Sequence, residues 1–380
     1  QKTCISKDWL LSAPGTNGFV PVDLPNDYAV SQTRDPHAPG GGSNGFYPCG
    51  TGRYLKYMRF PEDTEHVILD VDGAYMLTTM CVNDDQLVIH PHGYTPYLLD
   101  ITDRIRRGHT NKIELKTQCL QPSTRWYSGA GVYRDVFLWT GGCVRVEPWD
   151  IFVKTKLLDD GTALVIAEYA VSSDIAGEAE LTVSIADTTA PTTRIIPVTP
   201  GKKTWCSIVM RVEKPRLWNT VAPHLYALHT EIAVSGQTTD TADTTFGIRT
   251  ISADAKNGFL LNGEPMKLRG GCIHHDHGVL GAAAFPAAEE RKLTRLKEAS
   301  FNALRIAHNP PSLALLEICD QIGMIVMDEA YDMWNRQNNA LDNHLWFADW
   351  WERDITAMVR RDRNHPCVVS YSIGNEIVER

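Results

Sequence analysis

Short runs in which apolar and polar residues alternate fill the first 144 positions of the chain, separated by Gly, Pro, Asn and Asp. Two clear runs are residues 65–72 and 86–90, and no helical period of apolar residues competes with them. Alternation with a period of two, bounded by turn residues, is typical of half-buried β-strands. The pattern therefore predicts a two-sheet jelly roll or sandwich over residues 1–144.

A second series of alternating runs extends over residues 145–248. The runs are residues 152–158, 163–170, 179–186, 205–212 and 226–234. Spacing of this kind over about a hundred residues is typical of a seven-strand sandwich. No constellation of catalytic residue types accompanies these runs, so we expect this domain to fix the outer domains relative to one another.

After residue 248 short apolar strands begin to alternate with helical patterns. The predicted strands are residues 266–269, 302–306, 324–327 and 367–372, and the predicted helices are residues 286–300, 312–322 and 346–361. Such alternation predicts βα units and a parallel sheet. Four strands are half of a (β/α)8 barrel, so residues 249–380 are interpreted as the N-terminal half of a TIM barrel.

Residues of a catalytic kind follow each of these four predicted strands. In strand order they are His274, His275 and Asp276; His308 and Asn309; Asp328 and Glu329; Asn375 and Glu376. In a (β/α)8 barrel the active site lies where the strands end, so the four clusters are expected to face one spot. Glu376 is the candidate general acid. The alternative is that Glu376 belongs to the first turn of a following helix, where the helix dipole favours an acid.

Residues 123–135 interleave three aromatic residues and two arginines with small residues. Arg125 offers a guanidinium fork and Trp126 an aromatic face, two groups suited to sugar recognition. The alternative is that these aromatic residues only anchor a glycine-rich crossing. Trp334 is interpreted as a wall of the sugar subsite, since an aromatic face stacks on the apolar face of a pyranose.

The composition excludes several classes of partner. The chain has 380 residues, of which 43% are hydrophobic and 22% charged, and this length suits two or three domains. No stretch of eighteen apolar residues occurs, so no membrane span is expected. A net charge of −9 without a Lys/Arg-rich run argues against nucleic acid or anionic lipid and favours a neutral, polar small molecule.

Nine cysteines are scattered without a Cys-x-x-Cys pair. This pattern predicts mostly free, buried thiols rather than a disulfide framework or a zinc site. Within residues 274–277 adjacent strand side chains point to opposite sides, so neither a metal nor another cofactor is expected there. The sequence opens at Gln1 without a signal segment, which leaves a secreted or periplasmic enzyme with a removed leader and a cytoplasmic enzyme both open.

Several motifs in a fixed order give the chain a family resemblance. They lie at residues 45–47, 52–54, 82–83, 92–97, 100–102, 125–136, 246–249, 261–265, 304–311, 328–330 and 363–376. Together they make the chain resemble glycoside hydrolase family 2, the family of β-galactosidases, β-glucuronidases and β-mannosidases. The resemblance covers essentially all 380 residues.

The resemblance implies a sugar-binding jelly roll, an immunoglobulin-like sandwich and a barrel that cleaves β-glycosides with retention of configuration. Glu376 matches the family's acid/base, and Asn375 matches the residue that hydrogen-bonds the sugar 2-hydroxyl. Arg305 and His308 match barrel-end positions that line the sugar subsite. His275 and Asp276 match a histidine–acid pair on the first strand and are counted, with Asn309, among the expected substrate-binding residues. The family's nucleophile would lie beyond residue 380, so residues 1–380 alone are expected to hydrolyse no aryl β-glycoside.

Terminal β-galactosides are the expected substrate, and β-glucuronides are the alternative within the same family. Some family members bind Mg²⁺ through a Glu and a His shortly after the third strand. Here Asp332 is not followed by a histidine until His344, so we do not expect this chain to bind that Mg²⁺ ion.

A hypothesis of another class is that the chain is a non-catalytic carbohydrate-binding or assembly module, in which the jelly roll and residues 123–135 would bind the partner. Burial of an open barrel edge in a homo-oligomer is a further hypothesis.

Overall fold

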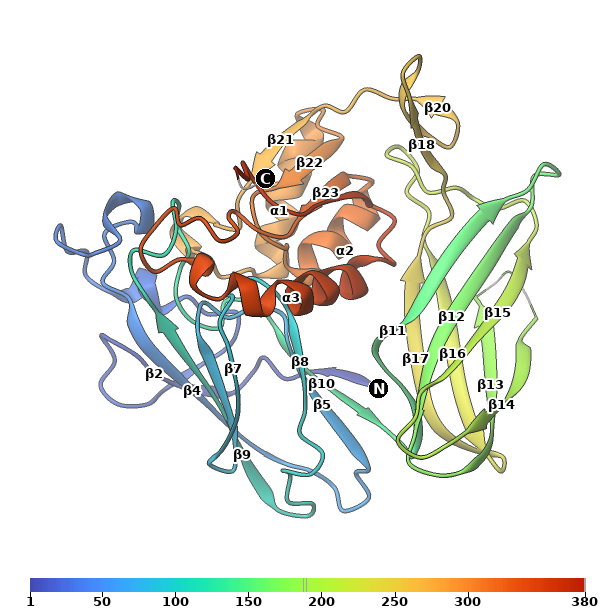
Figure 1. Cartoon of the computed structure of the whole chain (residues 1–380), viewed down its shortest axis with the longest axis horizontal. Coiled ribbons are helices and arrows are strands. Elements are labelled where there is room, and N and C mark those ends of the chain that lie inside the picture. The colour runs from blue at the N-terminus through green and yellow to red at the C-terminus, as the bar shows by residue number, and fades with distance from the viewer. Residues whose placement is uncertain (187, 189, 379–380) are drawn as a thin grey trace.

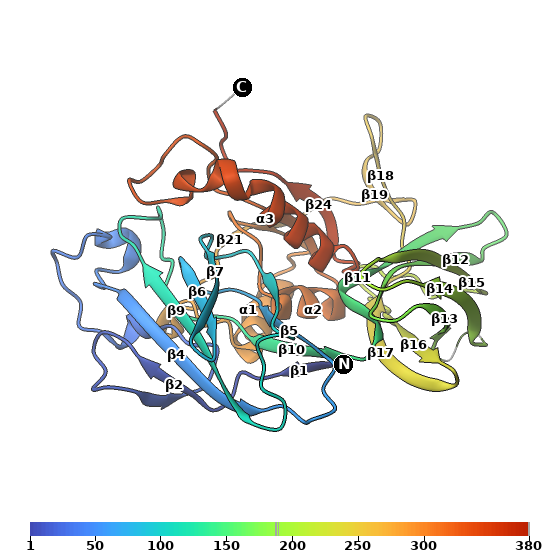
Figure 2. The same cartoon turned by 60° about the horizontal axis from the view of Figure 1, so that its bottom comes forward.

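The computed structural model describes residues 1–186, 188 and 190–378. Two β-sandwiches lie side by side, and a smaller α/β part sits over their junction in both views (Figures 1 and 2). None of the described helices is long and apolar enough to cross a bilayer.

The first sandwich consists of two antiparallel sheets. The larger has the order β3-β2-β4-β9-β6-β7 and contains β2 (Trp9–Ser12), β3 (Val20–Val22), β4 (Gly50–Arg59), β6 (Thr78–Val82), β7 (Asp85–His90) and β9 (Thr110–Cys119). The smaller has the order β1-β10-β5-β8 and contains β1 (Lys2–Cys4), β5 (His66–Val71), β8 (Tyr97–Asp100) and β10 (Val136–Gly141). Both sheets pack on one core that includes the fully buried Trp9, Tyr54 and Leu69. The short 3₁₀ helices η1 (Tyr28–Ser31) and η2 (Gly41–Asn44) lie in its loops.

The second sandwich has seven strands in the described part of the chain. One sheet has the order β11-β12-β15, from β11 (Val144–Leu157), β12 (Ala163–Ser173) and β15 (Thr204–Val212). The other has the order β14-β13-β16-β17, from β13 (Gly177–Ile185), β14 (Thr192–Val198), β16 (Tyr226–Val234) and β17 (Gln237–Phe246). The five predicted runs overlap β11, β12, β13, β15 and β16. The alternating pattern did not predict strands β14 and β17, because they lie at the edges of their sheet and bury few apolar side chains.

The α/β part follows a small hairpin sheet made of β18 (Ile251–Asp254), β19 (Gly258–Leu261) and β20 (Glu264–Pro265). Its parallel sheet has the order β21-β22-β23-β24, from β21 (Gly270–Ile273), β22 (Ala303–Ile306), β23 (Ile325–Glu329) and β24 (Val368–Ser372). Its helices are η3 (Gly278–Leu280), α1 (Pro286–Glu298), α2 (Leu313–Ile322), η4 (Asn343–Leu345) and α3 (Phe347–Asp362). Sequential parallel neighbours joined by helices make this sheet a partial TIM barrel.

The first barrel strand was placed too early by the sequence pattern. Residues 266–269 precede β21, and the Met266 N–H instead donates to the Phe259 carbonyl of β19. The true strand opens with Gly270 and Gly271, which lowered its apparent strand character. Glycine is required at Gly270 because a Cβ there would lie 1.9 Å from the Ala303 carbonyl oxygen of β22.

Helix α2 is capped at both ends. The Ser312 hydroxyl accepts a hydrogen bond from the Leu315 N–H at 3.3 Å, and Gly323 ends the helix at φ +71°. A side-chain oxygen at the N-cap satisfies a free N–H group, and glycine at the C-cap adopts the left-handed conformation without a Cβ clash. These caps fix where β23 begins and therefore where its last residue, Glu329, lies.

Buried arginines hold the barrel part on the first sandwich. Arg361 of α3 pairs with Asp72 at 2.7 Å, and the Asp72 carboxylate also accepts from the Leu313 N–H at 3.0 Å. Arg134 of the first sandwich donates to the Pro310 carbonyl at 2.7 Å. Charges buried this deeply are costly unless they are paired, so these contacts fix the relative placement of the two parts.

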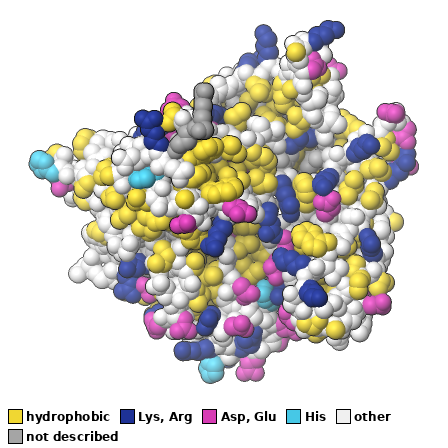
Figure 3. Space-filling model, viewed as in Figure 1, with side chains coloured by type: hydrophobic (Ala, Val, Ile, Leu, Met, Phe, Trp, Pro, Cys, Tyr) yellow, Lys and Arg dark blue, Asp and Glu magenta, His cyan; other side chains and the backbone are white. Residues whose placement is uncertain are grey.

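The last strand of the parallel sheet has one neighbour among the described strands. Tyr371 of β24 and Ile373 just after it are 38% and 57% exposed. Figure 3 shows hydrophobic side chains gathered between α3 and the end of the described chain. Strand β24 is thus an edge strand with an exposed apolar side, the kind of edge that proteins usually cover.

Candidate active site

Polar side chains from three neighbouring barrel strands meet where those strands end. Arg305 lies on β22, Glu329 is the last residue of β23, and Ser372 is the last residue of β24. The register places Glu329 opposite Ser372. Asn375 and Glu376 follow β24 directly, so the carboxyl ends of the strands bring all five residues into one region.

Glu329 is the buried centre of this region. Its Oε2 accepts from Arg305 Nη2 at 2.7 Å, from Arg305 Nε at 3.1 Å and from the Ser372 hydroxyl at 2.7 Å. Its Oε1 lies 2.6 Å from His308 Nδ1. Burial alone would raise the pKa of Glu329, but the hydrogen bonds from His308, Ser372 and Arg305 outweigh it and hold the pKa below its ordinary value. Glu329 is therefore a carboxylate whose two oxygens are both occupied.

Asn375 is fixed by partners on both sides of its amide. Its Oδ1 accepts from Arg305 Nη2 at 2.9 Å, and its Nδ2 donates to Asp332 Oδ1 at 3.0 Å. Its backbone N–H donates to the Tyr331 carbonyl at 2.8 Å. The amide of Asn375 therefore has one defined orientation, and the residue after it is held at a fixed point.

Glu376 differs from its neighbours because its side chain is 74% exposed. Among the described residues its side chain contacts Arg125, whose Nη1 lies 3.5 Å from the Glu376 Oε2. Its backbone has φ +48°, a left-handed conformation that turns the chain directly after Asn375. The carboxyl group of Glu376 is thus presented to solvent beside the strand ends.

The loop at residues 123–135 of the first sandwich reaches this same region. Arg125 binds Asp332 in a fork, with Nη2 at 2.6 Å from Oδ1 and Nε at 3.2 Å from Oδ2. The Trp126 ring lies 4.7 Å from the ring of His274 and 4.8 Å from that of His308. The first sandwich therefore supplies side chains to the region where the barrel strands end.

Two of the predicted site residues turn toward the interface with the first sandwich instead. His275 packs against the ring of Tyr94 at 4.8 Å, and its Nε2 lies 3.1 Å from the Ser128 carbonyl oxygen. Burial lowers the pKa of His275 to about 3, so it is neutral. Asn309 is buried and lines the same small space as His92 of the first sandwich. The neighbouring Asp276 is exposed.

Trp334 lies directly under the turn that carries Asn375. Its Nε1 donates to the Ile373 carbonyl at 2.9 Å, and its ring stacks on Phe347 at 5.7 Å. A Cβ on Gly374 would lie 2.8 Å from that same Nε1. Glycine at position 374 is thus needed for the close approach of the indole, and Trp334 supports the turn.

Sequence reasoning overlooked Ser372 and Asp332 as organisers of the site and gave Glu329 no role of its own. A usable signal was present, because Glu329 closely follows the predicted strand at residues 324–327 and Ser372 ends the next predicted strand, so their side chains are expected to lie near each other. Asp332 was weighed only as a metal ligand. Its oxygens accept from Arg125, Asn375 and, at 3.2 Å, Asn338 Nδ2. Among the described residues no group of three or more His, Cys, Asp and Glu is arranged to hold a metal ion.

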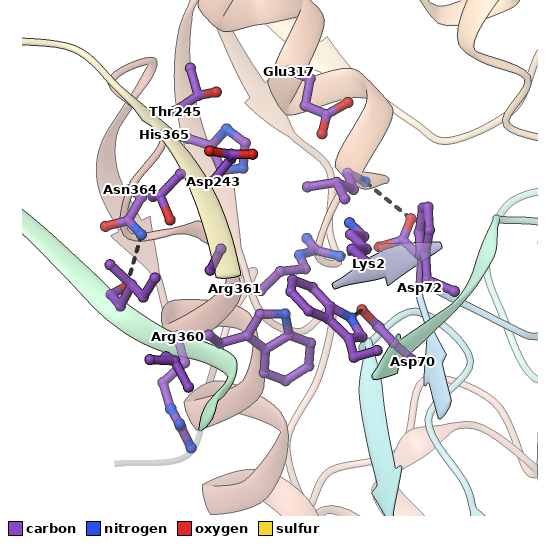
Figure 4. Close-up of a pocket in the computed structure, with 18 of the residues that line it drawn as sticks. Lys2, Asp70, Asp72, Asp243, Thr245, Glu317, Arg360, Arg361, Asn364 and His365 are labelled. Atoms are coloured by element: carbon purple, nitrogen blue, oxygen red, sulfur yellow. Dashed lines mark hydrogen bonds and ion pairs between the residues drawn. The ribbon is translucent and has the colours of Figure 1, made fainter. Parts of the chain in front are cut away.

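A large cavity lies away from the strand ends. It encloses about 450 Å³ at the junction of the three parts of the molecule, between β10, β11, α2 and α3. Figure 4 shows Asp70 and Lys2 on one side of it and Asn364 and His365 on the other. Enclosed spaces next to His274 and Trp126 measure only about 10 to 30 Å³. The candidate site is marked by the hydrogen-bond network at the strand ends.

Comparisons with known proteins agree with this geometry. Residues 144–249 match the family model described as glycosyl hydrolases family 2, and residues 254–380 match its TIM barrel domain. The beta-galactosidase BoGH2A of Bacteroides ovatus is 36% identical over 373 residues, which are 96% of this chain and 44% of that protein. A beta-glucuronidase of Bacteroides fragilis is 25% identical over 355 residues, 88% of this chain and 51% of that protein.

A solved glycosyl hydrolase family 2 member from Bacteroides cellulosilyticus superposes with a TM-score of 0.95 at 36% identity. The match covers 100% of this chain and 52% of that one. The chain thus spans about half the length of the relatives it matches. The predicted family resemblance is confirmed, as are a β-sandwich and a partial TIM barrel. Because two models of one family together match more than half of the chain, and relatives match nearly all of it, the chain belongs to glycosyl hydrolase family 2.

Proposed function

We propose that the protein of which this chain is part is a retaining exo-β-glycosidase that hydrolyses terminal β-galactosides. Glu376 is its general acid/base. The observation that carries the proposal is the fixed turn at Asn375, which holds a 74% exposed carboxyl group beside the strand ends. A group that must donate a proton to a departing oxygen needs both this fixed position and this access.

A retaining glycosidase needs a second carboxylate roughly 5 Å from the first to attack the anomeric carbon. Glu329 is a poor candidate for that role because its two oxygens accept four hydrogen bonds and it is fully buried. We infer that the nucleophile is a different glutamate, outside the described residues. In the two-step reaction Glu376 first protonates the glycosidic oxygen and then takes a proton from the attacking water.

The other strand-end residues are proposed to bind the sugar. Glu329 orients Arg305 and His308, and Arg305 in turn orients Asn375. Further proposed contributors to the sugar subsite are Arg125, Trp126, His275, Asp276, Asn309 and Trp334. For His275 and Asn309 their places beside the first sandwich indicate a supporting position, and for Trp334 a position below the turn.

A neutral sugar suits the charges at the strand ends. The guanidinium group of Arg305 is paired with Glu329 and that of Arg125 with Asp332. Each of these cations already has a carboxylate partner, so neither offers an uncompensated charge to a glucuronate carboxylate. Relatives named beta-galactosidase are 36% and 25% identical to this chain, a relative named putative beta-glucuronidase is 30% identical, and one named beta-glucuronidase is 25% identical. β-Glucuronides are the second candidate substrate.

The proposed domain division is residues 1–144, 145–248 and 249–380. This division is supported by the ends of three strands: β10 ends at Gly141, β11 begins at Val144 and β17 ends at Phe246.

The first of these domains, with Arg125 and Trp126, is the part that a non-catalytic carbohydrate-binding role would use. Sugar binding that survives deletion of everything after Ile248 would support that role, and its loss would place binding on the barrel.

The deciding experiment compares hydrolysis of aryl β-galactosides and aryl β-glucuronides by the full-length enzyme and its Glu376→Gln variant. We expect galactoside turnover that the substitution removes. The isolated chain of 380 residues is expected to turn over neither substrate. Turnover by the isolated chain that Glu376→Gln abolishes would contradict the second expectation, and turnover unaffected by the substitution would contradict the first.

A further inference from the structure

A buried carboxylate in the first sandwich accepts hydrogen bonds from distant parts of the chain. Asp27 directly precedes η1 and is 4% exposed. Its Oδ1 accepts from the Ala29 N–H and from the Ala130 N–H, each at 2.9 Å. Its Oδ2 accepts from the Tyr127 hydroxyl at 2.6 Å and from the Ala282 N–H at 2.9 Å. Both oxygens of one carboxylate are therefore occupied by two donors each.

The four donors belong to three separate pieces of chain. One lies in η1 itself, and two lie in the loop at residues 123–135. The fourth lies in residues 274–285, the segment that joins β21 to α1. The loop carries Arg125, and the segment begins with His274. The carboxylate thus joins a loop of the first sandwich to the segment that follows the first barrel strand.

Two glycines allow this close approach to the carboxylate. A Cβ on Gly129 would lie 2.6 Å from the Asp27 Oδ2, and a Cβ on Gly281 would lie 2.2 Å from the same atom. The two glycines have φ +69° and φ +63°, a backbone conformation that other residues rarely adopt. Both pieces of chain are therefore shaped to surround the carboxylate, and a larger residue at either glycine would displace it.

The four donors of Asp27 are neutral groups, three amides and one hydroxyl. A buried charge is costly unless hydrogen bonds compensate it, and here they come from the pieces of chain that the carboxylate joins. Asparagine has the same size but only one acceptor oxygen, so its amide nitrogen would face two of the donors. We therefore expect Asp27→Asn to separate the loop from the segment.

The joined pieces lead directly to the candidate active site. The Trp126 ring packs on the ring of His274 at 4.7 Å, and the residue after Trp126 is the tyrosine that donates to the carboxylate. The residue before it, Arg125, contacts Glu376 at 3.5 Å. A shift of the loop relative to the segment would therefore move side chains that lie at the strand ends.

We propose that Asp27 is a positioning residue, which sets the loop at residues 123–135 against residues 274–285 and so places Arg125 and Trp126 at the sugar subsite. Its effect on turnover rests on the proposed function, whereas the joint between the two pieces of chain does not. Asp27 acts through the side chains that it places and is not itself a catalytic residue.

Hydrogen–deuterium exchange of the full-length enzyme tests the joint without any substrate. In Asp27→Asn, peptides from residues 123–135 and 274–285 should exchange about tenfold faster or more, the factor expected for loss of a hydrogen bond to a charged group. Peptides from residues 163–170 in the second sandwich should not change. Tyr127→Phe, which removes one donor and keeps the ring, should act in the same direction.

Tyr28→Phe is the matched control. Tyr28 lies next to Asp27 and is buried, but its hydroxyl donates to the Gly50 carbonyl at 2.8 Å and so stays within the first sandwich. This variant also loses one buried hydroxyl. It should leave exchange in residues 123–135 and 274–285 as it is in the wild type.

Steady-state kinetics then tests whether the joint positions the site. The substrate is whichever aryl β-glycoside the wild-type enzyme cleaves. For Asp27→Asn we expect kcat/KM to fall about tenfold, with a rise in KM. A purely structural role would reduce the amount of folded enzyme and leave KM unchanged, because KM does not depend on enzyme concentration. Combining Asp27→Asn with Tyr127→Phe should lower kcat/KM no further, since both remove the same contact.

The outcomes separate this proposal from the proposed function. Faster exchange confined to the two pieces of chain, together with a raised KM, supports it. Unchanged exchange in both pieces overturns it, as does an unchanged KM or faster exchange throughout the chain. If Asp27→Asn does not fold, Tyr127→Phe decides by the same criteria. If the wild type cleaves no glycoside, the proposed function fails, and the exchange data alone decide whether Asp27 joins the loop to the segment.

Discussion

Glu329 ends strand β23, and Glu376 lies just beyond the end of the neighbouring strand β24. The two glutamates differ in burial and in hydrogen bonding. Glu329 is fully buried and accepts four hydrogen bonds from three residues. Glu376 is 74% exposed, and among the described residues its side chain has a polar contact with Arg125 at 3.5 Å. The first arrangement holds the carboxylate between fixed partners, and the second leaves the carboxyl group accessible to solvent. The same side chain thus serves as an organiser at one strand end and is proposed as a reagent at the next.

The contrast predicts that the two glutamates fail in different ways when they are changed. Loss of an organiser leaves its partners buried without compensation and should lower the free energy of unfolding. Loss of an exposed reagent should lower the rate and leave the fold intact. Measuring both quantities for both variants separates the two roles.

The largest expected effect is on the rate of the Glu376→Gln enzyme. General acid–base catalysis contributes roughly 10²- to 10⁴-fold, so kcat of the full-length enzyme on a galactoside with a poor leaving group should fall by about that factor. An aryl galactoside with a good leaving group needs less protonation and should be affected less in its first step. Steady-state kinetics on the two substrates tests this difference.

The control for this variant is its stability. Because the Glu376 side chain is mostly exposed, the Tm of Glu376→Gln should stay within a degree or two of the wild type, as is usual for surface substitutions. A large fall in Tm with a proportional loss of activity would show instead that Glu376 is structural, and the contrast with Glu329 would disappear.

The next effect in size is on the stability of the Glu329→Gln variant. Gln keeps the size of the side chain but removes the charge that pairs with Arg305 and His308. Breaking a buried pair by removing one partner costs about 3 kcal/mol or more. Urea unfolding of the chain at pH 7 should show this loss, and the Glu376→Gln variant, unfolded in parallel, should not. Equal stabilities of the two variants would contradict the division of roles.

Much of this comparison could be predicted from sequence, because strand order alone places four polar clusters at one sheet edge. Glu376 stood out through Gly374-Asn375-Glu376 and the family resemblance. What the pattern could not give was the direction in which a side chain points once the chain leaves the strand. His275 and Asn309 follow barrel strands but turn toward Tyr94 and His92. The first strand was misplaced because Gly270, needed for close approach to Ala303, looks unlike a strand residue.

A smaller effect is expected from changing the arginine that touches both regions. Arg125→Met removes the fork to Asp332 and the contact with Glu376, while it keeps most of the side-chain volume. Since Arg125 is 36% exposed, we expect about 1 kcal/mol or less of lost stability. Asp332 would then hold Asn375 less firmly, which should appear as a modest fall in kcat. Arg125→Lys, the matched control, keeps the charge but loses the fork.

If Arg125→Lys is as impaired in stability and rate as Arg125→Met, the planar guanidinium fork is required for the interaction with Asp332. If Arg125→Lys has the stability and rate of the wild type, the positive charge alone is sufficient for that interaction. A wild-type rate and stability in Arg125→Met would show that the loop at residues 123–135 lies near the strand ends without supporting them.

The smallest effect is a pH dependence that distinguishes Glu329 from Asp328, its neighbour on the other face of β23. The pKa of Glu329 is held below its ordinary value of 4.5, so its stabilising contribution is present above that pH and is lost as the pH falls through the folded-state pKa. The gap in Tm between wild type and Glu329→Gln should therefore narrow below about pH 4.5.

Burial and the nearby Asp362 raise the pKa of Asp328 well above 3.8, so its effect on stability changes with pH in the opposite direction to that of Glu329. Ionisation of Asp328 lowers the stability of the folded chain as the pH rises. The Tm of Asp328→Asn should therefore increase relative to that of the wild type from pH 4 upward. Thermal unfolding of both variants from pH 3 to pH 7 would reveal two trends of opposite sign. Parallel trends would mean that the two faces of β23 do not impose different environments on their carboxyl groups.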